Sequence, residues 1–197
     1  MQNLDPEILL TFQQLQSQAY EVGEPDPTAM TLATADAECR VSLRAVLLKH
    51  GDEQGFVFYT NLHSHKGQQL AVNPRAALCF LWLRLRNQVQ VRVEGAVEAV
   101  SAAEADAYFA SRARDSQIGA WASLQSQTLP DRATFDTRID EFQRRFAGQT
   151  VPRPPHWSGR RLRPDMVEFW YGARFRLHQR DRWEWQAGAW QRRLLYP

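Results

Sequence analysis

The chain has 197 residues, of which 44% are hydrophobic and 11% aromatic, and its formal net charge is +2. This length suffices for one domain with a buried core, and the near-neutral charge gives no argument for a nucleic acid or membrane partner. The longest apolar run, residues 76–83, is far too short to span a bilayer. Met1 is followed by polar and acidic residues, so no secretory signal is expected. We therefore expect one cytoplasmic domain over residues 1–197.

The first part of the chain combines one helix with a series of strands. Apolar residues at helical spacing predict an amphipathic helix over about residues 6–20, and Pro25 and Pro27 separate it from the next segment. Short apolar or alternating runs then predict strands, at residues 29–35, 41–49, 56–60, 76–83 and 89–100. Tight connections imply antiparallel pairing, which favours a barrel or a sandwich.

Helices interrupt and follow these strands. Residues 64–72 predict a short helix that Asn73-Pro74 ends. A capping box at residues 101–104 opens a helix that continues to about residue 112. Asp115 or Ser116 can cap the next helix, which we expect to end near residue 123.

The C-terminal third carries a further helix and a second strand-like region. Phenylalanine and isoleucine at helical spacing predict an amphipathic helix over residues 135–146. Alternating runs rich in Trp and Arg follow at about residues 165–197, so a nucleic-acid-binding surface is one alternative. Against it, Glu168, Asp181 and Glu184 interrupt the basic residues, and tryptophan at this density is typical of packing.

A polar stretch at residues 108–126 offers the first candidate for a binding site. Tyr108, Arg112 and Ser116 recur every four residues, so on a continuous helix they would share one side. Three hydrogen-bond donors, one of them permanently charged, suit an anion. A solvated helix face explains the same spacing, and the two interpretations stay open on spacing alone.

The two lysines of the chain, Lys49 and Lys66, lie in further candidate sites. In an arginine-rich chain a retained lysine can mark a place for a compact ammonium. Arg44 and Lys49 are an odd number of residues apart, so a regular strand would point them to opposite faces, toward two neighbouring ligands or toward core and solvent. Ser64 to Lys66 precede a helix, whose N-terminus favours a phosphate.

Other polar residues are further candidates for ligand binding, but none of them indicates a metal site. Gln125 and Ser126 supply neutral donors for a phosphate or a flavin edge. Arg176 and His178 would share one strand face with Trp170. The histidines lack a neighbouring carboxylate or thiolate pattern, and the two cysteines are widely separated, so we expect no metal site and no disulfide. The chain has no GxGxxG, P-loop, HExxH or GxSxG motif.

Taken in order, these motifs resemble the pyridoxine/pyridoxamine 5′-phosphate oxidase family. The matching runs are Arg44–His50, Phe56–Asn61, Ser64–Gly67, Ser111–Gln127 and Val167–Arg180. The resemblance implies a mainly β (α+β) fold, an antiparallel FMN-binding split β-barrel with flanking helices. It also implies a homodimer with composite active sites, no nucleic acid and no membrane. The implied reaction is oxidation of pyridoxamine or pyridoxine 5′-phosphate to pyridoxal 5′-phosphate, with O2 as acceptor and H2O2 as product.

The same resemblance assigns roles to residues. It implies FMN contacts at Arg44, Ala45, Val46, Leu47, Leu48, Lys49, Tyr59, Thr60, His65, Lys66, Gln88, Gln125, Ser126, Trp170 and Arg180. It implies that the substrate phosphate is held by Lys49, Tyr108, Arg112 and Ser116. Arg176 and His178 correspond to the catalytic pair that also binds the substrate ring.

Three departures from the family pattern qualify these expectations. His65 stands where the family usually has arginine, so one flavin-phosphate contact should be weaker or depend on pH. The family's basic N-terminal segment has no match in MQNLDPE, which predicts a reduced closing segment, and the ending RLLYP is one residue longer than usual. A related flavin oxidase acting on a dihydrophenazine precursor is a further alternative, although it would have no use for a phosphate clamp.

Overall fold

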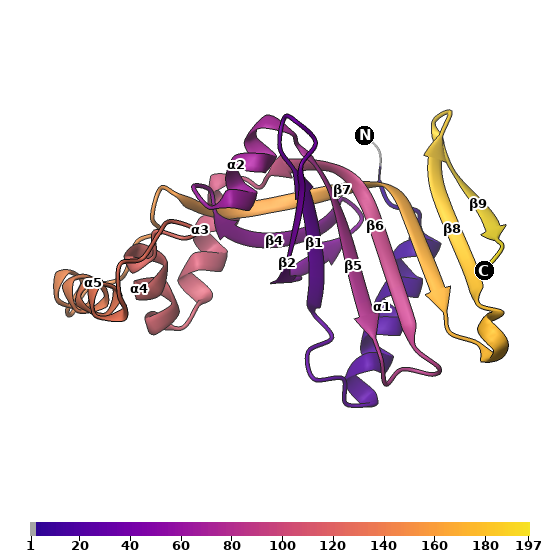
Figure 1. Ribbon diagram of the computed structural model, residues 1–197, viewed down its shortest axis with the longest axis horizontal. Coiled ribbons are helices and arrows are strands. Elements are labelled where there is room, and N and C mark those ends of the chain that lie inside the picture. The colour runs from indigo at the N-terminus through magenta and orange to yellow at the C-terminus, as the bar shows by residue number, and fades with distance from the viewer. Residues whose placement is uncertain (1–2) are drawn as a thin grey trace.

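A curved antiparallel sheet carries a lobe of helices at one side (Figure 1). The computed structural model describes residues 3–197. Its helices are α1 (Pro6–Glu21), α2 (His65–Val72), α3 (Ala102–Ser111), α4 (Arg114–Ala122), α5 (Arg132–Arg145) and the short 3-10 helix η1 (Arg174–Arg176). Its strands are β1 (Ala29–Ala35), β2 (Val41–Leu47), β3 (His50–Asp52), β4 (Gly55–Asn61), β5 (Arg75–Trp82), β6 (Val89–Ala99), β7 (Trp157–Tyr171), β8 (Gln179–Gln186) and β9 (Ala189–Leu195).

The long strand β7 organises the sheet, whose main path runs β2-β1-β5-β6-β7-β4-β3. Its first half, Trp157–Leu162, pairs with β4, and its second half, Met166–Tyr171, pairs with β8. Strand β6 lies along both halves, and their register shifts just before Gly95, opposite Pro164. A side chain at Gly95 would collide with the backbone carbonyl of Arg163, so the bend requires glycine there. The sheet therefore divides at this bend into a half-barrel and a C-terminal hairpin arm.

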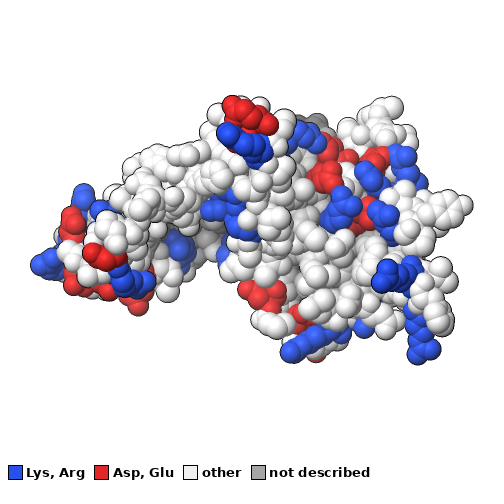
Figure 2. Space-filling view, in the orientation of Figure 1, with Lys and Arg blue, Asp and Glu red and all other residues white. Residues whose placement is uncertain are grey.

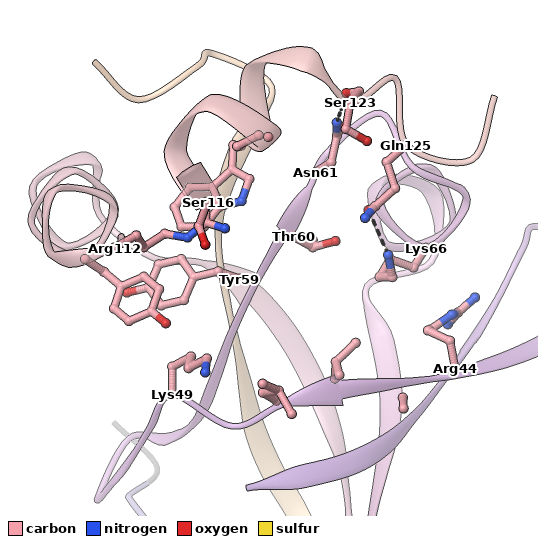
Figure 3. A pocket seen from close by; sticks show the side chains of 17 residues that line it. Arg44, Lys49, Tyr59, Thr60, Asn61, Lys66, Arg112, Ser116, Ser123 and Gln125 are labelled. Atoms are coloured by element: carbon pink, nitrogen blue, oxygen red, sulfur yellow. Dashed lines mark hydrogen bonds between the residues drawn. The ribbon is translucent and has the colours of Figure 1, made fainter. Parts of the chain in front are cut away.

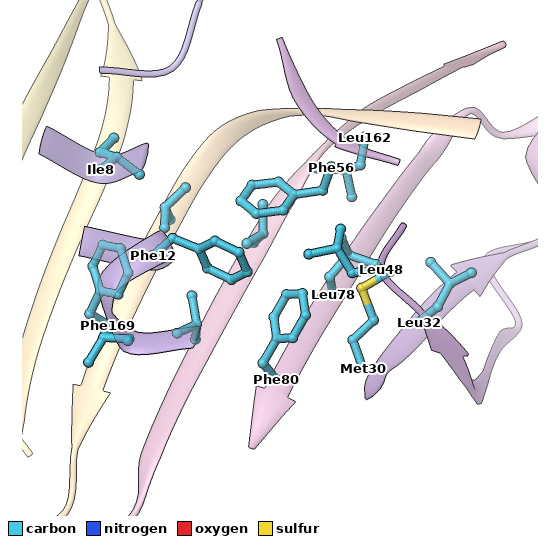
Figure 4. Close-up of a cluster of buried hydrophobic side chains, with 14 of the residues drawn as sticks. Ile8, Phe12, Met30, Leu32, Leu48, Phe56, Leu78, Phe80, Leu162 and Phe169 are labelled. Atoms are coloured by element: carbon cyan, nitrogen blue, oxygen red, sulfur yellow. The ribbon is translucent and has the colours of Figure 1, made fainter. Parts of the chain in front are cut away.

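Helix α1 packs on the inner face of the sheet, as its apolar periodicity predicts. Ile8 and Phe12 are fully buried, and the ring of Phe12 meets Phe56 at 4.9 Å and Phe80 at 5.1 Å (Figure 4). Edge-on aromatic contacts of this kind stabilise the packing beyond the area they bury. The half-barrel thus has a closed apolar interior, and polar chemistry is left to its edges.

The helical lobe has its own core and corrects one expectation. Helix α3 ends at Ser111, close to the predicted end near residue 112, and Arg112 is extended (φ −74°, ψ 149°), so Tyr108, Arg112 and Ser116 do not lie on one continuous helix. Helix α4 has Ala113 at its N-cap and no side-chain cap. The prediction of a cap at Asp115 or Ser116 was wrong because both residues lie inside the first turn.

Two expectations for the C-terminal region also change. The strand begins at Trp157, well before residue 165. Arg176 and His178 do not share a strand face, because the chain turns through η1, where Phe175 and Arg176 have left-handed backbone conformations (φ 59° and 62°). Such strain in residues other than glycine is typical of functional turns.

The surface of the C-terminal hairpin mixes basic and acidic side chains (Figure 2). Among residues 3–197, no helix has the length and apolar character needed to cross a membrane. The expected reduction of an N-terminal closing segment concerns a stretch that includes residues 1–2, which lie outside the described residues.

Candidate active site

A cavity of about 490 Å³ opens between the sheet edge at β2 and β4, helix α2 and the helical lobe (Figure 3). Its volume is in the range of small-molecule sites. The predicted site residues that line it are Arg44, Ala45, Val46, Leu47, Lys49, Tyr59, Thr60, Lys66, Tyr108, Arg112, Ser116 and Gln125. Segments far apart in the sequence therefore meet at one place.

Four cations line this cavity, and none forms an ion pair with a carboxylate of the described residues; they are Arg44, Lys49, Lys66 and Arg112. Burial lowers the pKa of Arg44 and of Arg112, and burial together with the charge of Arg44 lowers the pKa of Lys66. Their charges are thus desolvated without a compensating anion. A bound anion would supply the missing partner.

One end of the cavity is built by β2 and α2. Ser64 caps α2 by accepting from the backbone N–H of Gly67, which fixes the helix N-terminus beside Lys66. The ammonium of Lys66 donates to Oε1 of Gln125 at 3.0 Å and lies 3.4 Å from Oγ of Ser64. Arg44 lies close to this end in Figure 3. A cation at a helix N-terminus is a good setting for a phosphate group.

The other end is built by aromatic rings. Tyr59 stacks on Tyr108 at 4.0 Å and on Trp157 at 5.1 Å, and Arg112 lies over the ring of Trp157 at 4.8 Å. Nη1 of Arg112 is buried and has no hydrogen-bond partner among the residues that the structure describes. Burial raises the pKa of Tyr59 to about 12, with Glu104 and Tyr108 adding to the shift, so its hydroxyl stays neutral. A buried, unused N–H of a guanidinium is a strong indication of a ligand oxygen.

The structure corrects the argument from strand parity for Arg44 and Lys49. Strand β2 ends at Leu47, and the backbone N–H of Lys49 already bonds to Val57 of β4. Lys49 therefore does not follow the alternation of the strand. Both cations line the cavity, at different ends of it (Figure 3).

Some lining residues were not predicted, namely Asn61, Gly119, Ala120, Ser123 and Trp157. Trp157 has the clearest role, since it carries both the tyrosine stack and Arg112. The only signal in the sequence was an isolated tryptophan after the proline-rich segment at residues 151–155, which composition alone assigns to packing.

The remaining predicted residues lie outside the cavity lining; they are Leu48, His65, Gln88, Ser126, Trp170, Arg176, His178 and Arg180. The side chain of Leu48 is buried in the sheet core, and His65 is exposed at the start of α2. Ser126 follows Gln125 with a left-handed backbone (φ 73°). No group of three or more His, Cys, Asp or Glu that could hold a metal ion occurs within residues 3–197.

Most of these outlying residues form a second group around η1, far from the helical lobe (Figure 1). The ring of His178 lies 4.4 Å from that of Trp170, and its Nδ1 accepts the backbone N–H of Ala173 at 3.2 Å. Arg180 donates to both carboxylate oxygens of Glu168, at 2.8 and 3.1 Å. The group is therefore ordered but separate from the cavity of its own chain.

The curved antiparallel sheet with its helical lobe defines the fold class as a split barrel, and the cationic cavity makes it a candidate binder of anionic ligands. A pyridoxamine 5′-phosphate oxidase-related, FMN-binding protein from Nostoc punctiforme shares this fold, with a TM-score of 0.73 at 14% identity over 98% of this chain and 99% of that one. The model described as Pyridoxamine 5′-phosphate oxidase matches residues 17–146, and the model of the Pyridoxine 5′-phosphate oxidase C-terminal dimerisation region matches residues 157–197.

Full-length relatives make the assignment specific. The pyridoxine/pyridoxamine 5′-phosphate oxidase of Xanthomonas euvesicatoria is 54% identical, with 100% of each chain covered, and that of Myxococcus xanthus is 50% identical over 98% of this chain and 93% of that one. The structure of PhzG from Burkholderia lata in complex with tetrahydrophenazine-1-carboxylic acid gives a TM-score of 0.87 at 30% identity, over 98% and 93%. The chain belongs to the pyridoxine/pyridoxamine 5′-phosphate oxidase family, and the split-barrel fold is confirmed.

Proposed function

We propose that this chain binds FMN in the cavity and uses it to oxidise pyridoxine or pyridoxamine 5′-phosphate to pyridoxal 5′-phosphate, the reaction of its family. The observation that supports this assignment most strongly is the set of cavity cations without carboxylate partners. The residues present fit two phosphate groups. Arg44, Lys66 and Gln125 would hold the flavin phosphate, while Lys49 and Arg112 would hold that of the substrate.

Bound FMN would supply the redox chemistry: it would accept a hydride from C4′ of the substrate, and O2 would then reoxidise it and be reduced to H2O2. The protein contributes position. A phosphate held by Lys49, Arg112 and Ser116 supplies binding energy away from the reacting carbon, and that energy fixes the substrate ring against the flavin. Tyr108 adds a hydroxyl at the same end of the cavity. Removal of the clamp should therefore weaken binding of phosphorylated substrates.

The second group of residues would reach the cavity from another copy of the chain. Val41 and Leu43 project from β2 with 70% and 69% of their surface exposed, and Leu81 of β5 is 49% exposed. An apolar sheet face of this kind is typical of a subunit interface. The match of residues 157–197 to a dimerisation region supports a homodimer. Arg176 and His178 of one copy would then complete the site of its partner.

His178 suits a role as a hydrogen-bond donor toward the substrate. Because the N–H of Ala173 donates to Nδ1, the neutral imidazole carries its proton on Nε2. Nε2–H is thus the donor left to bond an acceptor atom of the substrate. Arg176 lies on the strained turn beside it, which holds both side chains at the tip of the hairpin arm.

The similarity to PhzG supports a second candidate, oxidation of a reduced phenazine precursor. That substrate carries a carboxylate but no phosphate, so it would use the cavity cations differently. The two functions are distinguished by comparing turnover of pyridoxine 5′-phosphate, pyridoxine and a dihydrophenazine carboxylate by protein reconstituted with FMN.

The proposed function predicts turnover of pyridoxine 5′-phosphate and a large loss when the phosphate is absent. Equal turnover of pyridoxine, or turnover of the dihydrophenazine alone, would contradict it. A protein that takes up no FMN would contradict both candidates.

A further inference from the structure

Beneath Arg44 lies a buried polar network whose centre is Gln69 of α2. Gln69 is 3% exposed, and its Oε1 accepts from Oγ1 of Thr34 at 2.5 Å and from Oγ of Ser42 at 2.9 Å. Nη2 of Arg44 is 3.4 Å from the same oxygen. Thr34 and Ser42 are cross-strand partners on β1 and β2. The side chain of Gln69 therefore contacts both strands and the guanidinium of Arg44.

The direction of each hydrogen bond in this network is set by Gln69. Arg44 donates to Oγ1 of Thr34 at 2.6 Å and to Oγ of Ser42 at 2.7 Å. A hydroxyl has one proton, and each of these hydroxyls gives it to Oε1 of Gln69. Its lone pairs are therefore left to accept from the guanidinium. The Nε2 group of Gln69, which lies 3.4 Å from the carbonyl of Arg40, keeps Oε1 turned toward the hydroxyls.

The network orients Arg44 without neutralising it. Among the described residues, its Nη1 and Nη2 groups bond only to neutral oxygens, those of Leu32, Thr34, Ser42 and Gln69. A carboxylate in place of the amide would form a buried ion pair with Arg44 and use its charge within the protein. The amide supplies the same acceptor geometry and leaves the charge for an anion in the cavity.

We infer that Gln69 is a positioning residue for the flavin phosphate: it fixes Arg44 through Thr34 and Ser42 and, because it is neutral, preserves the charge that binds the anion. This role rests on the proposed function. It assigns no contact between Gln69 and the cofactor itself.

The test is a double-mutant cycle between positions 69 and 44, with FMN affinity measured by quenching of flavin fluorescence on the apo protein. We expect Gln69→Glu to raise the Kd for FMN at least about tenfold. Gln68→Glu is the matched control, since the same change is made one residue earlier on an exposed side chain of the same helix, and its Kd should stay within about twofold. In an Arg44→Met background, Gln69→Glu should cause no further loss.

Equal effects of Gln69→Glu and Gln68→Glu on the Kd would overturn the inference, as would a loss that persists undiminished in the Arg44→Met background. A second cycle measures the free energy of unfolding of the apo protein and needs no FMN. Gln69→Glu should couple to Arg44 there through the new ion pair, and the absence of coupling would also overturn the inference. Failure of the unsubstituted protein to bind FMN would instead count against the proposed function, so the two failures are distinguishable.

Discussion

Within residues 3–197, Arg112 is held by two aromatic rings and by no carboxylate. Its guanidinium lies 4.8 Å from the ring of Trp157 and 5.6 Å from that of Phe109. Cation–π contacts fix the planar group but leave its charge and its N–H groups free. The buried Nη1 is such a free donor. At the scale of the residue, aromatic support explains how a cation can be both rigid and available.

The first prediction concerns this arginine. Arg112→Ala should cost roughly 2 to 3 kcal/mol of phosphate binding, a rise in KM for pyridoxine 5′-phosphate of about 30- to 150-fold. This KM is measured by steady-state kinetics of the FMN-loaded protein. Arg132→Ala, at an exposed arginine of α5, is the control and should leave KM unchanged. An unchanged KM for Arg112→Ala would remove this residue from the phosphate clamp.

Lys66 gives a prediction about pH. Burial and the charge of Arg44 lower its pKa below the ordinary 10.5, so near that pH the folded apo protein binds fewer protons than the unfolded chain. Its stability relative to Lys66→Met should therefore rise with pH between the lowered pKa and 10.5. FMN affinity should fall over the same window as the ammonium loses its proton. Chemical unfolding at several pH values measures the first effect, and a pH-independent difference between the two proteins would contradict it.

At the scale of the element, the sequence predicts α1 and β1 well, because the buried residues of α1 recur at helical spacing and those of β1 alternate with more exposed ones. It hides the first half of β7 for physical reasons. Arg161 in this half is almost fully buried, yet it is charged and pairs with Asp52 at 2.6 Å and Glu104 at 3.3 Å. Pro164 argues against a strand, but it lies at the register shift near Gly95. In the sequence, a charged residue and a proline so close together indicate a loop, and only the structure shows the carboxylate partners of Arg161 and the register shift that accommodates Pro164.

The break between α3 and α4 was predicted only in part. The expected helix end near residue 112 agrees with the observed end at Ser111, but the cap of the next helix was placed two or three residues too late. The observed N-cap is Ala113, whose side chain cannot cap and therefore gives no signal in the sequence. The structure brings Tyr108, Arg112 and Ser116 to one cavity across an extended Arg112, which their spacing of four residues does not predict.

A substitution at Gly159 of β7 tests whether close packing of this strand positions Tyr59 at the cavity. A Cβ at this position would lie 2.6 Å from Cγ2 of Val100 and 2.8 Å from Cε1 of Tyr59, so Gly159→Ala must displace packed side chains. We expect a loss of about 1 to 3 kcal/mol in the free energy of unfolding, measured in denaturant, and weaker FMN binding as Tyr59 shifts.

Gly119→Ala is the control for this substitution. No atom lies within 4 Å of a Cβ at Gly119, and the residue is inside α4, where alanine is favoured over glycine. The apo protein with this change should be as stable as the original or more so. If Gly159→Ala had the same free energy of unfolding as the unsubstituted protein, the prediction would be contradicted, because the neighbouring side chains would then accommodate the Cβ without loss of stability.

At the scale of the whole molecule, the arginines of β8 and β9 form ion pairs with carboxylates. Arg180 pairs with Glu168 and Arg192 with Asp181, and Arg193 pairs with Glu184. Figure 2 shows the two charges interspersed on this part of the surface. The sequence showed the excess of arginine but not its pairing, which only the register of β7, β8 and β9 provides. A nucleic-acid surface has no support from this arrangement.

The whole molecule also determines which residues can share a site. The cavity holds the cations that we propose to bind phosphate, and the η1 turn holds Arg176 and His178 at the end of the sheet away from the helical lobe (Figure 1). The family resemblance implied composite sites, and the separation of the two groups within one chain is what such sites require. Each proposed site therefore depends on residues from two copies of the chain.

The direct test uses dimers purified through two different tags. One chain carries Lys49→Ala with Arg112→Ala, and the other carries Arg176→Ala with His178→Ala. In a composite arrangement each such heterodimer has one intact site and one site with all four changes. Formation of pyridoxal 5′-phosphate from pyridoxine 5′-phosphate should then proceed at about half the rate of the unsubstituted dimer, while each parent homodimer is nearly inactive. A heterodimer as inactive as its parents would contradict the composite site, because it would place both groups in the site of a single chain.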